Sequence, residues 1–161
     1  MVGKTALLVV AGSLALAAAA YGALVVGTPG DDALVGTPDA DVIYGRGGND
    51  SIRARAGRDE IYGQAGGDRI KAGAGNDVSH GGGGPDSMWA GRGSDRQFGG
   101  PGDDVLHALA DDDQVDMLAC GAGDDVAWLN QNERGLYRID GCEILKIVVP
   151  SAEELAAEDE D

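Results

Sequence analysis

The chain carries a strict repeat of nine residues, and this period constrains its fold more than any other feature. Ten units follow one another from Gly27 to Asp116 without insertion or deletion. The fourth position is glycine in eight units, and Asp39 and Asp111 replace it in the other two. The sixth position is always aspartate: Asp32, Asp41, Asp50, Asp59, Asp68, Asp77, Asp86, Asp95, Asp104 and Asp113.

The eighth position supplies the apolar side chains of the repeat. It is apolar in eight units, whereas Ser79 and Gln97 occupy it in the other two. We predict that each unit forms a polar six-residue turn and a three-residue strand whose middle residue faces inward. For Ser79 and Gln97 we expect a local packing defect with a mutual or water-bridged hydrogen bond. A buried polar site is the alternative.

The consensus of these units is Gly-Gly-x-Gly-x-Asp-x-U-x, where U is apolar. The chain therefore resembles the RTX, or hemolysin-type, calcium-binding repeat proteins over about 90 of its 161 residues. The resemblance implies an all-β fold, a parallel β-roll in which two units form one 18-residue coil and strands alternate between two sheets. The sequence contains the same 18-residue spacing, because alanine takes the first position only in alternate units, at Ala54, Ala72, Ala90 and Ala108.

In such a roll, equivalent aspartates line up along two edges at the strand spacing of about 4.8 Å. Two carboxylates at this distance repel each other by roughly 3–4 kcal/mol at an effective dielectric constant near 20. A cation between successive turns reverses the sign of this interaction. Carboxylate and carbonyl oxygens favour calcium over softer metals. Five turns on each edge leave four gaps, so we expect up to about eight Ca²⁺ ions and a metal-free chain that is largely disordered.

The predicted metal ligands are the ten aspartates and a set of glycines in the turns. Glycines at the first and fourth positions tolerate a positive φ and let backbones approach closely, so their carbonyl groups can point at a shared ion. The glycines assigned to the sites are Gly45, Gly47, Gly48, Gly63, Gly66, Gly81, Gly84, Gly99 and Gly102.

Residues 1–20 have the features of a secretory signal peptide. Lys4 provides the positive charge, residues 6–20 form an apolar stretch, and three alanines before Tyr21 form a small-residue cleavage site. We therefore predict a secreted, extracellular protein. An uncleaved N-terminal membrane anchor is the alternative, because apolar residues continue to Val26.

The remaining chain divides into residues 21–116, the β-roll, residues 117–149, a small C-terminal β cap, and residues 150–161, an acidic tail. Repeat arrays need atypical ends that cover the last open coil. Trp128 and the run Ile144–Val149 provide the apolar side chains of this cap. The tail starts with a weak helix-capping box.

The cap also contains one more turn-like unit, from Cys120 to Asp125, and the only two cysteines. An even pair of cysteines in a secreted chain favours a disulfide, here between Cys120 and Cys142. The alternative is a metal or redox pair, but two thiols without a nearby histidine make a poor zinc site.

Charge and motifs exclude several functions. A formal net charge of −16 disfavours nucleic acid and anionic membrane surfaces as partners. The sequence contains no His-Glu-x-x-His and no Gly-x-Ser-x-Gly, so the metalloprotease and lipase motifs are absent. His80 and His107 fall at outward ninth positions in different sheets and are predicted to be surface residues. We therefore expect no enzymatic activity.

Two functional hypotheses remain. The first is a stand-alone secreted calcium-binding roll whose chemistry is calcium-dependent folding. The second is an extracellular adhesin that uses the roll as a scaffold to bind a glycan or a cell-surface ligand. Its candidate patch is an aromatic row on one sheet with Trp89 on the other, although such rows also simply stiffen a sheet. The row consists of Tyr44, Tyr62, His80 and Phe98.

Overall fold

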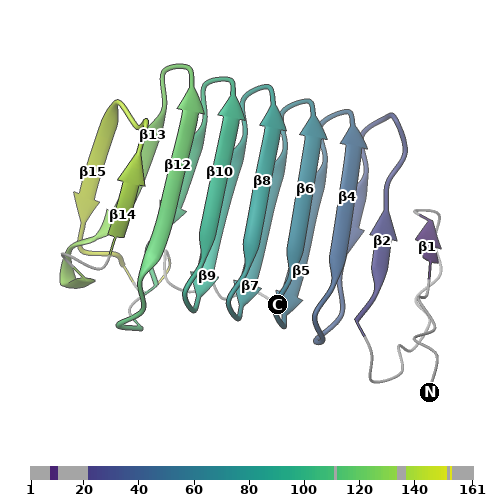
Figure 1. Cartoon of the computed structure of the whole chain (residues 1–161), viewed down its shortest axis with the longest axis horizontal. Coiled ribbons are helices and arrows are strands. Elements are labelled where there is room, and N and C mark those ends of the chain that lie inside the picture. The colour runs from purple at the N-terminus through teal and green to yellow at the C-terminus, as the bar shows by residue number, and fades with distance from the viewer. Residues whose placement is uncertain (1–7, 11–21, 111, 134–136, 152, 154–161) are drawn as a thin grey trace.

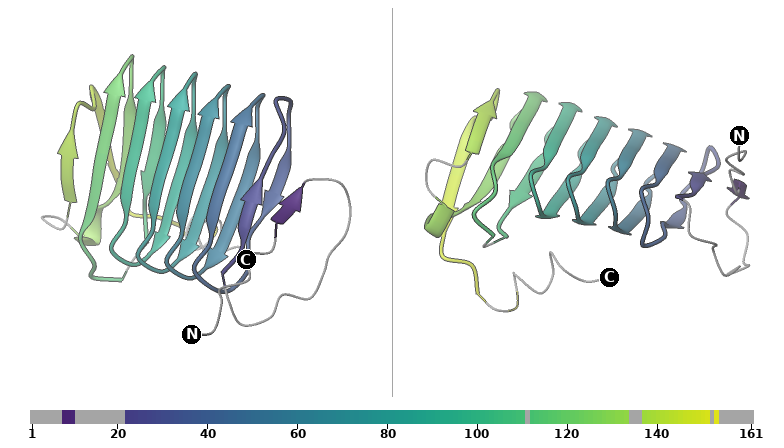
Figure 2. Two further views of the ribbon diagram at one scale, coloured as in Figure 1. Left: turned by 45° about the vertical axis from the view of Figure 1, so that its right-hand side comes forward. Right: turned by 60° about the horizontal axis from the view of Figure 1, so that its bottom comes forward.

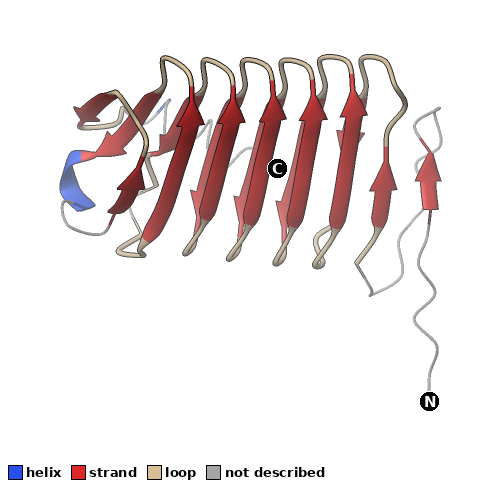
Figure 3. Ribbon diagram, turned by 45° about the horizontal axis from the view of Figure 1, so that its top comes forward, coloured by secondary structure: helices blue, strands red, loops and turns tan. Residues whose placement is uncertain are grey.

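The computed structural model describes residues 8–10, 22–110, 112–133, 137–151 and 153. They form a parallel β-solenoid in which two sheets face each other and the chain winds between them (Figures 1 and 2). A short 3₁₀ helix, η1 (Gln131–Glu133), lies near the C-terminal end of the roll (Figure 3). The predicted all-β parallel β-roll is therefore confirmed.

Every strand pairs in parallel with the strand one coil further along. The eight-stranded sheet contains β1 (Leu8–Val10), β2 (Leu24–Val26), β4 (Val42–Gly47), β6 (Glu60–Ala65), β8 (Val78–Gly83), β10 (Arg96–Pro101), β12 (Asp116–Ala122) and β14 (Tyr137–Asp140). The seven-stranded sheet contains β3 (Ala33–Val35), β5 (Ser51–Ala56), β7 (Arg69–Ala74), β9 (Ser87–Arg92), β11 (Val105–Ala108), β13 (Val126–Asn130) and β15 (Ile144–Val148).

The strands are longer than the three residues predicted from the repeat. From β4 to β10 each strand has six residues, so only three residues remain for each turn. Backbone pairing continues past the apolar residues, as between Arg46 and Gln64. From Gly45 to Ala108 the first position of each unit therefore lies inside a strand and faces the core. It is a buried glycine in the eight-stranded sheet, such as Gly63, and a buried alanine in the other, such as Ala72.

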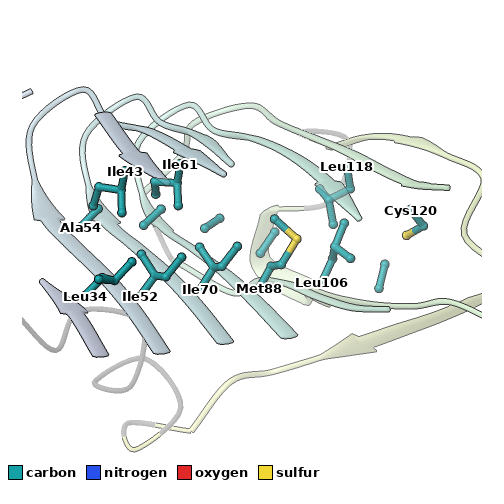
Figure 4. Close-up of a cluster of buried hydrophobic side chains, with 14 of the residues drawn as sticks. Leu34, Ile43, Ile52, Ala54, Ile61, Ile70, Met88, Leu106, Leu118 and Cys120 are labelled. Atoms are coloured by element: carbon teal, nitrogen blue, oxygen red, sulfur yellow. The ribbon is translucent and has the colours of Figure 1, made fainter. Parts of the chain in front are cut away.

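The core is a single layer of side chains between the two sheets. The eighth-position residues of one sheet face those of the other (Figure 4). Each is at most 2% exposed, and the row consists of Leu34, Ile43, Ile52, Ile61, Ile70, Met88, Leu106 and Leu118. Small first-position residues fill the space between them, which keeps the sheets close together.

The nine-residue period breaks at the tenth unit. β8 and β10 pair with an offset of 18 residues, whereas β10 and β12 pair with an offset of 21, as between Arg96 and Met117. Leu109 and Ala110 stay buried after β11, at 3% and 5% exposure, so the chain turns later than the period predicts. Asp113 consequently lies in an exposed turn with a φ of 59°.

The residues that take over the tenth unit lie three positions further along. Val115, predicted to face inward, is 41% exposed, and Leu118 occupies the inward position instead. Asp116 likewise stands where the period places Asp113.

The C-terminal strands β12 to β15 continue the two sheets as further coils of the same solenoid. A disulfide joins Cys120 in β12 to Cys142, which lies between β14 and β15, with 5.1 Å between their Cα atoms. The predicted disulfide is thus present and links two adjacent coils.

The apolar run assigned to the cap is only half-buried. Ile144, Leu145 and Ile147 are 48–50% exposed, because β15 is the last strand of its sheet and has no neighbour on its far side. Trp128 faces outward in β13 and does not join the core cluster.

The N-terminal predictions fall mostly outside the described residues. Within the predicted signal peptide only β1 is described, and it pairs with β2. The rest of residues 1–20 and most of the acidic tail, including its capping box, lie outside the described ranges. In the part of the chain that the structure covers, no helix has the length and apolar character needed to cross a bilayer.

Stacked rings run along both outer faces of the roll. On the eight-stranded sheet the centroids of Tyr44, Tyr62, His80 and Phe98 are 4.6–5.1 Å apart, with planes within 10° of parallel. On the seven-stranded sheet Trp89, His107 and Trp128 stack with centroids 4.7 and 6.0 Å apart. Both histidines therefore lie at outward positions in different sheets, as predicted, and each ring inside a row has both faces covered.

The side-chain amide of Gln97 lies in the core without a hydrogen-bond partner among the described residues. Its side chain is 1% exposed, and neither Oε1 nor Nε2 finds a hydrogen-bond partner within the described residues. Ser79, in register on the neighbouring strand, is 2% exposed. The mutual hydrogen bond expected between these two side chains is not formed.

We predict that Gln97→Met stabilises the roll. Methionine fills nearly the same volume and removes two buried polar atoms whose desolvation costs about 1–3 kcal/mol. The free energy of unfolding in saturating calcium should rise by about that amount, measured by urea denaturation. Gln64→Met, at an exposed position, is the control and should change little. A loss of stability in Gln97→Met would indicate that the amide is satisfied in solution, for example by internal water.

Candidate metal sites along the two edges of the roll

The repeat aspartates form two columns, one on each edge of the roll. We call the edge that follows the eight-stranded sheet the glycine edge, because its turns come after strands with an inward glycine. Its column consists of Asp32, Asp50, Asp68, Asp86, Asp104 and Asp125. We call the opposite edge the alanine edge, and its column consists of Asp41, Asp59, Asp77, Asp95 and Asp116.

Nine of the ten predicted aspartates therefore stand in the columns, and Asp113 stands outside them. Two members, Asp116 and Asp125, were not among the predicted ligands. The signal for Asp125 was present in the sequence, since it ends the turn-like unit that starts at Cys120. The signal for Asp116 was masked by the three-residue slip.

One oxygen of each carboxylate links neighbouring coils. The backbone N–H of every column aspartate except the last on each edge donates to Oδ1 of the aspartate in the next coil, at 2.7–2.9 Å. At the end of the glycine edge Glu143 takes over this part and accepts from the N–H of Asp125. The bonds form a continuous ladder, so each aspartate fixes the register of the turn before it.

The other oxygen has no protein partner. Oδ2 of eight column aspartates is buried and makes no hydrogen bond within the described residues: Asp50, Asp59, Asp68, Asp77, Asp86, Asp95, Asp104 and Asp125. Buried polar atoms are normally satisfied, and a regular series of exceptions calls for a ligand outside the protein. A cation is the ligand that a row of carboxylate oxygens attracts.

The first turn of each edge differs from the later ones. Thr28 donates its N–H and its hydroxyl to Oδ2 of Asp32. Thr37 donates in the same way to the carboxylate of Asp41. In these two turns the side chain of a threonine satisfies the carboxylate, so Asp32 and Asp41 are less available to a metal than the later aspartates.

First-position glycines make room for the carboxylates on the glycine edge. A Cβ on Gly63 would lie 2.2 Å from Oδ2 of Asp68 and 2.5 Å from the carbonyl oxygen of Gly81. Gly45, Gly81 and Gly99 show the same arrangement with their own coils. None of these glycines has a positive φ, so space rather than backbone conformation requires them.

Fourth-position glycines do have the predicted positive φ, at 97° for Gly48, 126° for Gly66, 118° for Gly84 and 145° for Gly102. A Cβ on Gly66 would lie 1.9 Å from the carbonyl oxygen of Gly48 in the previous coil. Gly47, which is also among the predicted ligands, sits at the end of β4 with its nearest foreign atom 3.6 Å from a Cβ position.

Burial makes the charged form of the column carboxylates unfavourable. It raises the pKa of Asp59 to about 8 and that of Asp95 to about 9, partly offset by the N–H from the previous coil and reinforced by neighbouring aspartates. The pKa values of Asp86, Asp77 and Asp104 rise to about 7, 6 and 6 for the same leading reason. Without a cation Asp59 and Asp95 would therefore hold their protons at neutral pH.

The residues present fit a hard cation such as calcium. Within the described residues no three His, Cys, Asp or Glu side chains converge on one point, so side chains alone complete no metal site. Carboxylate Oδ2 atoms and backbone carbonyl oxygens do lie together, as Asp68 and Gly81 show. Calcium accepts such mixed oxygen ligands in flexible geometry, whereas softer metals prefer nitrogen and sulfur.

Comparison with known proteins identifies the family. The model of the RTX calcium-binding nonapeptide repeat matches in four copies, at residues 26–61, 46–79, 54–88 and 89–117, which is more than half of the chain. The chain belongs to the RTX calcium-binding repeat family. No curated protein and no solved structure matches it significantly. The family match ends at residue 117, so the RTX roll continues in β13 to β15 beyond the recognised repeats.

We predict opposite effects of pH with and without calcium. A raised folded-state pKa means that the stability contributed by these groups is complete below the unfolded value near 3.9 and is lost as pH rises through the folded values of about 6 to 9. Calcium-depleted protein should therefore gain β structure on acidification from pH 9 to pH 5, followed by far-UV circular dichroism. The calcium midpoint, which is the calcium concentration at which half of the protein is folded, should rise on the same acidification because protons compete for the carboxylates. Equal β content of the depleted protein at both pH values would contradict the assignment.

We also predict that Gly63→Ala weakens calcium-dependent folding. The added methyl group enters the space between Oδ2 of Asp68 and the carbonyl of Gly81 and should cost about 1–3 kcal/mol. The calcium midpoint should rise accordingly in a circular dichroism titration. Gly83→Ala is the matched control, because its methyl group would meet only one ordinary contact, 4.0 Å away, and Gly83 is not among the predicted ligands. Equal midpoints for the two variants would show that the space beside Asp68 is not used.

Proposed function

We propose that this RTX protein is secreted, that it binds several Ca²⁺ ions between its stacked turns, and that calcium binding supplies the free energy of folding. The observation that carries the proposal is the series of eight buried carboxylate oxygens without a protein partner. The carboxylates repeat at the spacing of one coil along both edges, which is the arrangement that bridging cations require.

Energetics favour folding that depends on the metal. Burying an unpaired carboxylate costs several kcal/mol even after relaxation. The core that would offset this cost is a single layer, with one large side chain per strand at the eighth position. Metal-free chains can reduce the cost only by binding protons or by unfolding. Calcium removes it by supplying positive charge where the columns need it.

The two edges differ in the number of free carboxylates. On the glycine edge five consecutive column members have an unpaired Oδ2, which leaves four gaps between them. On the alanine edge three column members have an unpaired Oδ2. The ligands we assign are these aspartates with the neighbouring glycine carbonyls, and the total of up to about eight ions from the repeat count remains the upper bound.

Secretion is consistent with the disulfide. Cys120–Cys142 indicates an oxidising compartment, where such bonds persist. Extracellular calcium modules commonly bind with dissociation constants of about 10⁻⁴–10⁻³ M, so a roll with this range would be folded outside the cell. The carboxylates serve as repeated, equivalent ligands, and we propose no catalytic domain.

The adhesin hypothesis gains no support from the aromatic row on the eight-stranded sheet. Sugars stack on free ring faces, but Tyr62 and His80 each have a parallel ring on both sides. Only ring edges point outward from the inner members of the row. The stacking geometry is that of side chains that stiffen a sheet.

We predict that calcium folds the chain and that Asp68→Asn weakens this response. The amide keeps the Oδ1 acceptor for the N–H of Asp50 but removes the ligand charge, so the calcium midpoint should rise by roughly tenfold or more, because ligand charge sets affinity in such sites. A titration from a chelated start, followed by far-UV circular dichroism, measures the midpoint. Magnesium should not reproduce the gain of β structure.

The matched control is Asp103→Asn. Asp103 is an exposed turn aspartate one residue before the column, and Asn49 occupies the same position of the repeat. Its substitution should leave the midpoint nearly unchanged. Full β structure in chelator, unchanged by calcium, would contradict calcium-dependent folding. Equal effects of the two substitutions would contradict the assignment of the column.

A further inference from the structure

The outer face of the seven-stranded sheet is basic, although the chain as a whole is strongly acidic. On this face the seventh and ninth positions of the repeat, and their register partners in β13 and β15, flank the inward residue of each strand and point outward. Four of these outward residues are cations and none is a carboxylate. The set consists of Ala33, Val35, Ser51, Arg53, Arg69, Lys71, Ser87, Trp89, Val105, His107, Val126, Trp128, Ile144 and Lys146. The corresponding residues of the other sheet mix both signs. Acidic residues of the roll are concentrated in the turns instead.

Three of these cations surround one recess. A depression of about 260 Å³ is lined by Ser51, Ile52, Arg53, Arg69 and Lys71. The guanidinium of Arg69 lies 4.6 Å from the ring centroid of Trp89, so the ring holds this side chain beside the recess. Lys71 is only 9% exposed, packed between β5 and β9.

The arrangement places like charges side by side. Arg53 and Lys71 are direct register partners on neighbouring parallel strands, and Arg69 precedes Lys71 by two residues on the same face. Like charges in this relation destabilise a sheet. An anion in the recess would reverse that effect, and arginine presents a planar fork of donors that matches carboxylate and sulfate groups.

We infer that this face binds a linear acidic polysaccharide, with a sulfate or carboxylate group seated between Arg53, Arg69 and Lys71. The chain would run across the strands, toward Lys146 at the far end of the same sheet. This inference is independent of the calcium sites, which lie on the edges of the roll.

The shape and the rings of this face select the class of ligand. The width of the basic face equals the length of one strand, about 20 Å for six residues. Acidic turns border this face on both sides. A broad anionic surface such as a membrane or a duplex would meet these turns, whereas a single thin chain would not. Single-stranded nucleic acid binds by stacking bases on free ring faces. Here Arg69 and His107 cover the two sides of Trp89, and His107 and Lys146 cover those of Trp128.

The test is binding of size-defined dextran sulfate to the calcium-saturated full-length chain at about 0.15 M salt, measured by calorimetry. The test variant is Arg53→Gln with Arg69→Gln. The control variant is Arg58→Gln with Arg138→Gln, which removes the same charge from exposed arginines outside this face. Each lost charged hydrogen bond should weaken binding about tenfold. The control should stay within about twofold of the wild type.

Neutral dextran should not bind, and circular dichroism should show both variants folded in calcium. If the double variant does not fold, Arg69→Gln alone carries the comparison. Failure of dextran sulfate to bind in preference to neutral dextran would overturn the inference. Equal losses in test and control variants would also overturn it, because binding would then follow overall charge. Oligothymidylate that binds as tightly, with the same dependence on Arg53 and Arg69, would assign the face to nucleic acid instead.

Discussion

Each column aspartate uses its two carboxylate oxygens differently, and the rest of the roll depends on this division. Oδ1 accepts the backbone N–H of the previous turn, and this bond sets the spacing and register of the coils. Oδ2 is left buried without a protein partner. The same aspartate therefore aligns the turns through Oδ1 and adds the free-energy cost of a buried, unpaired Oδ2. Folding and cation binding are thus coupled through one side chain.

Glycine serves the roll in two physically distinct ways. At the fourth position it supplies a positive φ, and at the first position of the glycine edge it supplies space beside a carboxylate. The second position adds a third case. Arg46, Arg55 and Gln64 hold a φ of 81–87° there, whereas the later coils have glycine, as at Gly82. Non-glycine residues in such a conformation cost about 1–2 kcal/mol each, so the first coils carry backbone strain that the later coils lack.

Given the two-unit coil that the family resemblance implies, the period predicts the aspartate columns and the aromatic row of the eight-stranded sheet, because both follow from placing equivalent residues one above another. Other features depend on neighbours that a repeat count ignores. Strands extend through Gly45 because adjacent coils offer pairing partners. The tenth turn is delayed because Leu109 and Ala110 remain buried. Thr28 and Thr37 satisfy the first carboxylates through hydrogen bonds that no consensus position encodes.

Net charge is a poor guide to what a solenoid can bind. The value of −16 describes the whole chain, but in the described part of the roll the acidic groups lie mainly in the turns along the edges, and the cations Arg53, Arg69 and Lys71 lie on one face. Fields of exposed charges fade over a Debye length of about 8 Å at physiological salt, which is shorter than the strand that separates the two edges. The proposed calcium ions on the edges therefore matter to this face because they fold the roll that presents it, and not because they change its charge.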